Sequence, residues 1–137
     1  MKVIVKLNQG MKLIGFNEKG HQTFFDSHPD VGGEDSAATP MEVFLEALGA
    51  CTSMDVLSML RKRKKTICNF EISLEATRAP DHPKVFTKVI LAYKLESPDT
   101  TKEELEYVIK LSQDKYCTAS AMFKHSGCEI IYTSEIT

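Results

Sequence analysis

The sequence lacks several features that identify common classes of protein. Its 137 residues carry a net charge of −2, and proteins that bind polyanions usually have a clear basic excess, so we expect no nucleic-acid partner. No run approaches the ~20 apolar residues that a membrane-spanning helix needs, and lysines interrupt any signal-peptide core near the N-terminus. We therefore expect a cytoplasmic protein without a membrane partner, folded as a single domain over residues 1–137.

The sequence also lacks a Cys-x-x-Cys pair, which argues against a zinc ribbon and against a thioredoxin-type motif. The four histidines show no metal-ligand spacing, so we expect neither a metal nor another cofactor. What remains is a set of four cysteines: Cys51, Cys68, Cys117 and Cys128. In a reducing cytosol, each is either a small buried apolar residue or a working thiol.

Hydrophobic periodicity predicts an α+β fold with the element order βββ-α-ββ-αα-β. Alternating apolar residues predict strands over 2–8, 11–17, 21–26, 68–78, 85–95 and 128–137. Helices are expected over 40–63, from a cap at Thr100 or Thr101 to about residue 114, and over 119–125. The loop over 27–39 is long for a simple connection, and such loops are often functional.

The first helix has a well-defined start, because Thr39 and Glu42 form a capping-box pattern around Pro40. It is apolar on most sides, which is typical of a helix in a core or between subunits. The basic run over 61–65 favours a solvated helix end over a nucleic-acid patch. Glu42 and Cys51 lie about 180° apart on a straight helix, so Glu42 reaches Cys51 only across a subunit interface or after a kink.

Two of the cysteines are candidates for chemistry. Cys51 lies inside the apolar helix, where a packing role stays open, and Asp55 one turn later would raise rather than lower a thiol pKa. Cys117 precedes a short helix with Lys115 nearby, a position that stabilises a thiolate, although a packing role is open there too. We expect Cys68 and Cys128 to pack on the core faces of their strands.

The motifs Thr39-Pro40-Met41-Glu42, Gly49-Ala50-Cys51-Thr52-Ser53-Met54-Asp55-Val56 and Lys115-Tyr116-Cys117 together resemble the OsmC/Ohr family of thiol-dependent peroxidases. Their details are most similar to its OsmC-like, YhfA-type branch. The resemblance implies an OsmC-like fold, an intertwined homodimer with two central helices between wrapped antiparallel sheets.

The resemblance also implies the chemistry. Cys51 is then the peroxidatic thiol, Cys117 the resolving thiol and Glu42 a further catalytic residue. The implied partners are an organic hydroperoxide and an external dithiol reductant, with an apolar pocket lined by residues such as Phe44, Leu48 and Met54.

The sequence departs from the family pattern at three places. No arginine precedes Arg61, where peroxidases of the family carry an activating arginine, and Lys12 and Lys115 are the alternative cations. Met41 stands where the family has its glutamate, and Thr118 follows the second cysteine where proline is usual. The rival interpretation is therefore a non-catalytic dimer that binds a small apolar or lipid-like ligand.

Overall fold

The computed structural model describes all 137 residues. They form two compact units, Met1–Phe44 and Leu45–Thr137, and the expectation of a single domain stays a prediction. The predicted element order is confirmed, with a short turn of π-helix between the last two helices.

The first unit is built on a small antiparallel meander of β1 (Val3–Gln9), β2 (Lys12–Asn17) and β3 (Gln22–Phe25). Gly20 has a φ of +81°, as the predicted turn between β2 and β3 requires. A single 3-10 turn, η1 (Pro29–Val31), lies in the long loop that follows. The apolar face of β1 is open, since Val3, Val5 and Leu7 are 67%, 55% and 70% exposed.

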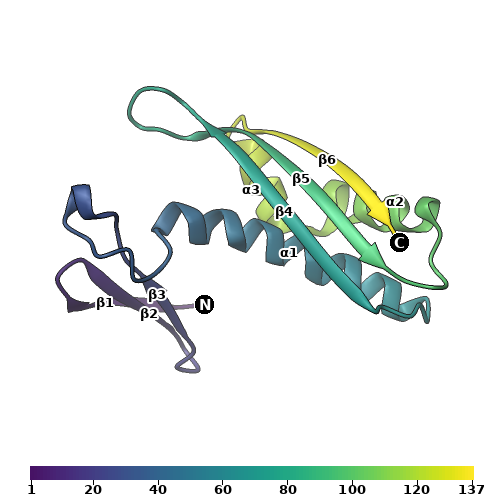
Figure 1. Cartoon of the computed structure of the whole chain (residues 1–137), viewed down its shortest axis with the longest axis horizontal. Coiled ribbons are helices and arrows are strands. Elements are labelled where there is room, and N and C mark those ends of the chain that lie inside the picture. Colours follow the sequence, from purple (N-terminus) through teal and green to yellow (C-terminus); the bar gives the residue numbers. More distant parts are fainter. The chain divides into compact units, whose positions relative to one another are not determined.

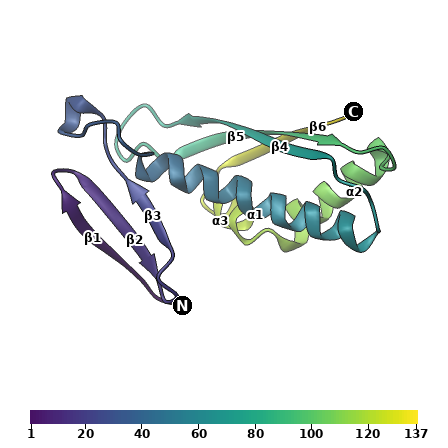
Figure 2. The same cartoon turned by 60° about the horizontal axis from the view of Figure 1, so that its bottom comes forward.

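The second unit has a three-stranded sheet in the order β4-β5-β6, covered by helices on one face (Figure 2). The long hairpin of β4 (Asn69–Arg78) and β5 (Phe86–Glu96) is as predicted. The last strand, β6 (Glu129–Ile136), pairs parallel to β5, which requires a crossover. The crossover contains α2 (Lys102–Leu111), the π-helical turn η2 (Ser112–Tyr116) and α3 (Thr118–His125).

Helix α1 (Pro40–Lys62) begins at the predicted capping box. The backbone N–H of Thr39 donates to Glu42 Oε2 at 2.7 Å, and the N–H of Glu42 donates back to Thr39 Oγ1 at 3.4 Å. Within the second unit, α1 lies along one face of the sheet (Figure 1 and Figure 2), and one stripe of the helix is buried. Its residues are Leu48, Gly49, Thr52, Val56 and Leu60.

The remaining faces of α1 are less covered than its composition predicts. Met54, for example, is 71% exposed. Helix α1 is also long and apolar enough to span a membrane, although no such run was expected from the sequence. The core helix of a soluble protein passes the same test, and one stripe of α1 is buried in the core of the second unit.

The two cysteines expected to pack on strands differ. Cys128 is 4% exposed and belongs to the core cluster, as predicted. The prediction for Cys68 is wrong, because Cys68 is exposed and lies one residue before β4 begins. Its N–H still donates to the carbonyl of Glu96 at 2.9 Å, so the strand pairing continues through Cys68. The alternation of apolar and polar residues predicts which face of the sheet a side chain lies on. It does not predict how far along the strand the helices cover that face.

Candidate functional site

The structure brings the two candidate thiols together, although they are distant in the sequence. Cys51 is half-buried in the middle of α1, and Cys117 is 3% exposed at the junction between η2 and α3. Cys51 lies close enough to Cys117 to contribute to raising the pKa of Cys117. All four cysteines are free thiols.

Cys117 is the N-cap of α3, as the sequence predicted, and its Sγ accepts a hydrogen bond from the N–H of Ser120 at 3.3 Å. The expected stabilisation of its thiolate is nevertheless wrong. Burial raises the pKa of the Cys117 thiol, and the opposing hydrogen bonds from Ser120 do not reverse the shift. The ammonium of Lys115 lies over the ring of Tyr116, 5.2 Å from its centre. Cys117 is therefore a thiol that keeps its proton at neutral pH.

A buried network of polar side chains adjoins the two thiols. It joins α1, β5, η2 and α3, and its members are Thr52, Tyr93, Ser112, Gln113 and Ser120, each at most 4% exposed. Thr52 Oγ1 lies 2.7 Å from the Tyr93 hydroxyl and 2.9 Å from Ser112 Oγ. Gln113 Nε2 donates to Thr52 Oγ1 at 3.1 Å and to the Tyr93 hydroxyl at 2.9 Å. On its other side, Gln113 Oε1 accepts from Ser120 Oγ at 2.8 Å.

The network has charged groups at its edges. Ser112 Oγ donates to Asp55 Oδ2 at 2.9 Å, which links the carboxylate one turn after Cys51 to the network. Lys124 Nζ donates to the backbone carbonyl of Gln113 at 2.6 Å. Sequence reasoning missed the network, and its only signal was Ser112, a polar residue at an apolar position of the helical period.

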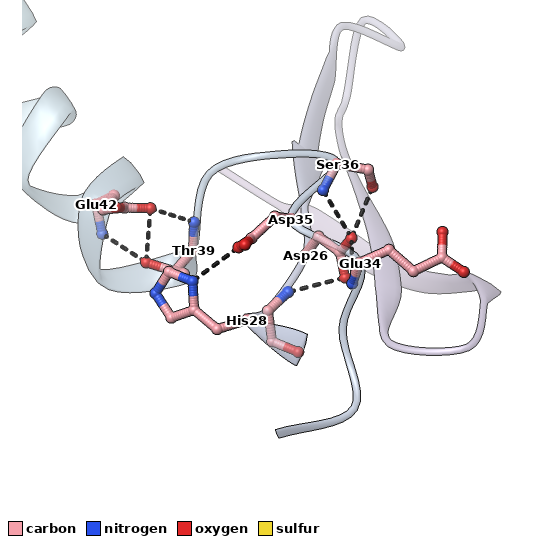
Figure 3. Close-up of polar contacts among 8 residues, drawn as sticks. Asp26, His28, Glu34, Asp35, Ser36, Thr39 and Glu42 are labelled. Carbon is pink, nitrogen blue, oxygen red and sulfur yellow. Dashed lines mark hydrogen bonds and ion pairs between the residues drawn. The ribbon is translucent and has the colours of Figure 1, made fainter. Parts of the chain in front are cut away.

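The first unit carries a second polar cluster, in the loop before α1 (Figure 3). Asp26 is 2% exposed, and its carboxylate accepts hydrogen bonds from the backbone of Ser27, Glu34 and Ser36 and from the Ser36 hydroxyl. These hydrogen bonds, led by those from Ser36, hold the pKa of Asp26 well below its usual range. Asp26 therefore acts as an ionised anchor for the loop.

The same loop places His28 against Asp35, with 2.7 Å between Nδ1 and Oδ1 (Figure 3). Asp35 raises the pKa of His28, and Glu42 adds a smaller electrostatic contribution. Hydrogen bonds from Thr39 lower the pKa of Glu42, whose carboxylate closes the capping box. Glu42 lies in the first unit and Cys51 in the second, so its catalytic role stays a prediction. The histidine–aspartate pair was not predicted from the sequence.

The structure also defines the surroundings of two further residues named from the sequence. Lys12, a candidate cation for the site, forms an ion pair with Glu34, which raises the pKa of Lys12. Leu48 does not line a pocket within the chain, because it is fully buried in the core. An open hollow of about 460 Å³ does lie along the exposed side of α1, and its lining includes Met54, Leu57 and Arg61.

The family model described as OsmC-like protein matches residues 33–133. Protein YhfA of Escherichia coli K12 is 30% identical over 124 residues, which cover 90% of each chain.

Solved structures give the same result for the fold. An OsmC-like protein from Mycoplasma pneumoniae has a TM-score of 0.83 at 16% identity, with 99% of this chain and 96% of the other covered. A protein from Legionella pneumophila, described as an organic hydroperoxide resistance protein OsmC, has a TM-score of 0.68 at 15% identity, with 98% and 97% covered. The two-sheet, three-helix α+β architecture is thus the OsmC-like fold, and this chain belongs to the OsmC-like protein family.

Proposed function

We propose that this protein is a thiol-dependent peroxidase that reduces organic hydroperoxides through Cys51 and Cys117. The observation that carries the proposal is that the half-buried thiol of Cys51 lies close enough to the buried thiol of Cys117 to affect its pKa. The description of the Legionella pneumophila protein as an organic hydroperoxide resistance protein adds support for the substrate class.

The proposed cycle has three balanced steps. The Cys51 thiolate attacks the outer peroxide oxygen, the O–O bond breaks, and the alkoxide takes a proton and leaves as an alcohol. The resulting Cys51 sulfenic acid condenses with the Cys117 thiol to form a disulfide and water. An external dithiol then reduces this disulfide by thiol–disulfide exchange and is itself oxidised.

The surroundings of the second thiol suit its proposed role. Burial raises the pKa of Cys117, so Cys117 keeps its proton and does not compete with Cys51 for peroxide. Its proximity to Cys51 provides a partner for the sulfenic acid before a second peroxide arrives. This arrangement limits over-oxidation to the irreversible sulfinic acid.

The direct test is consumption of tert-butyl hydroperoxide, with dithiothreitol as the reductant. We expect the wild-type protein to turn over, the Cys51→Ser variant to lose activity and the Cys117→Ser variant to accumulate over-oxidised Cys51, seen by mass spectrometry. Cys68→Ser is the matched control, because Cys68 is an exposed thiol outside the pair. Full activity of Cys51→Ser, or an equal loss in Cys68→Ser, would refute the proposal.

We also propose that the working unit is a homodimer. Each unit of the chain leaves apolar side chains uncovered: Val3, Val5 and Leu7 on β1, and Met54 on α1. Contiguous exposed apolar surface typically marks an interface, and a second copy of the chain would cover it. The same proposal places the dimer in the cytoplasm, where the reducing environment keeps its cysteines as thiols.

The oligomeric state is tested by light scattering after size exclusion. We expect the wild-type protein to elute at twice the mass of the chain and Met54→Glu to shift toward the monomer. Met122→Glu is the control, since Met122 is 66% exposed on α3 and the two variants introduce the same charge. A monomeric wild-type protein, or equal shifts in both variants, would contradict the proposal.

A further inference from the structure

The buried network beside the thiols has one consistent direction of hydrogen bonding. The Asp55 carboxylate only accepts, so Ser112 uses its single hydroxyl proton toward Asp55. Thr52 must then donate to Ser112, and the Tyr93 hydroxyl must donate to Thr52. Gln113 supplies the remaining donors through Nε2 and keeps Oε1 as an acceptor. Every buried polar atom of the network thus has a partner, which is the condition for such groups to be tolerated in a core.

This direction fixes the surroundings of Cys117. Ser120 Oγ donates to Gln113 Oε1 at 2.8 Å. The backbone N–H of Ser120 donates to Cys117 Sγ, and the N–H of Cys117 donates to the carbonyl of Ser112 at 2.8 Å. The turn that carries Cys117 is therefore held from both sides, and Gln113 holds it through Ser120.

The same side chain holds the other thiol's neighbour. Gln113 Nε2 donates to Thr52, which directly follows Cys51 on α1. Gln113 thus connects Thr52 with Ser120, and the N–H of Ser120 donates to the sulfur of Cys117. Gln113 lies in the π-helical turn η2, and such turns are frequent at functional sites.

We propose that Gln113 is a positioning residue that holds Cys117 within disulfide-forming reach of Cys51. A disulfide forms without backbone movement only when the Cα atoms lie within ~7 Å, so a small shift of the Cys117 turn changes how readily the bond forms. The inference rests on the proposed two-cysteine cycle, but it concerns the disulfide itself and is measurable without peroxide.

The test measures the equilibrium between the Cys51–Cys117 dithiol and its disulfide in glutathione buffers. All proteins carry Cys68→Ser, which removes the exposed thiol, and peptide mapping identifies the bond. Gln113→Met keeps the side-chain length and removes the hydrogen bonds. We expect it to lower the effective concentration of the two thiols at least about tenfold, which is roughly 1.4 kcal/mol or one buried hydrogen bond.

Ser97→Ala is the matched control, because Ser97 belongs to another buried hydroxyl pair, donating to Thr100 Oγ1 at 2.8 Å. We expect it to stay within about twofold of the wild-type equilibrium, whatever its effect on stability. Where Gln113→Met does not fold, Ser120→Ala decides, since it removes the hydroxyl that donates to Gln113 Oε1 and should lower the effective concentration severalfold.

Any of three results would overturn the inference. They are an unchanged equilibrium in Gln113→Met (or in Ser120→Ala where Gln113→Met does not fold), an equal fall in Ser97→Ala, and a wild-type protein that forms no Cys51–Cys117 disulfide. The outcome is independent of the proposed activity. A wild-type protein that ignores hydroperoxide while Gln113→Met weakens the disulfide refutes only the peroxidase proposal. Turnover in the wild type with an unchanged disulfide in Gln113→Met refutes only the positioning role.

Discussion

The hydroxyl of Tyr93 provides a sharp test of the buried network. Tyr93→Phe removes the donor to Thr52 and the acceptor for one N–H of Gln113, while Thr52 keeps its other two partners. One buried N–H is left unsatisfied, which costs about 1–3 kcal/mol. The ring itself stays, with its edge contacts to Phe70 and Tyr132, so no cavity adds to this loss. We expect the free energy of unfolding to fall by about 2 kcal/mol.

The same hydroxyl gives the effect a pH signature. Burial raises the pKa of Tyr93 to about 12, although the hydrogen bonds with Thr52 and Gln113 oppose the shift. An unfolded tyrosine has a pKa of ~10, so the folded state holds this proton more tightly. The stabilisation of the fold by this proton is complete below about pH 10 and is lost as the pH rises toward 12. The loss amounts to roughly 2–3 kcal/mol in the free energy of unfolding. Tyr93→Phe removes this dependence.

The assay is urea unfolding at pH 8, 10 and 11.5, comparing the wild type with Tyr93→Phe and with Tyr132→Phe. Tyr132 is the control because it contacts the Tyr93 ring but is 37% exposed. We expect the stability difference between wild type and Tyr93→Phe to shrink as the pH rises, and the difference for Tyr132→Phe to be small. A loss below ~0.5 kcal/mol at pH 8, or a difference that does not change with pH, would refute the assigned network.

Three further predictions concern other parts of the chain. Gly33→Ala should lower stability by about 2 kcal/mol or more in thermal unfolding, because the added Cβ would lie 1.8 Å from the carbonyl oxygen of Ser27. Because the pKa of Asp26 is depressed in the fold, its ionised carboxylate stabilises the protein at pH values above the ordinary pKa of aspartate. We therefore expect the stability of the wild type to fall from about pH 5 to pH 2, and that of Asp26→Asn to fall less, as measured by circular dichroism. Iodoacetamide should label exposed Cys68 well before Cys117, because burial shields Cys117 and raises its pKa; equal labelling rates by mass spectrometry would contradict this.

Much of the fold could be predicted because its signals are local. The capping box of Thr39 and Glu42 fixed the start of α1, and alternation placed the hairpin of β4 and β5. The prediction for Cys68 was wrong because exposure depends on what covers a strand, which no local pattern contains. The pKa direction for Cys117 was wrong for a similar reason, since desolvation outweighs the helix N-terminus only once the site is packed.

The sequence by itself determined the element order, the family resemblance and the choice of Cys51 and Cys117 as the candidate thiols, because periodicity and motif spacing are properties of the chain alone. Only the tertiary structure decided that these thiols lie close together, that β6 runs parallel to β5, and that Gln113 links Thr52 to Ser120. Each of these depends on side chains that are distant in sequence. The hydrogen bonds of the network form only in the packed core. There, water is excluded, and each buried polar group must pair with the protein groups beside it.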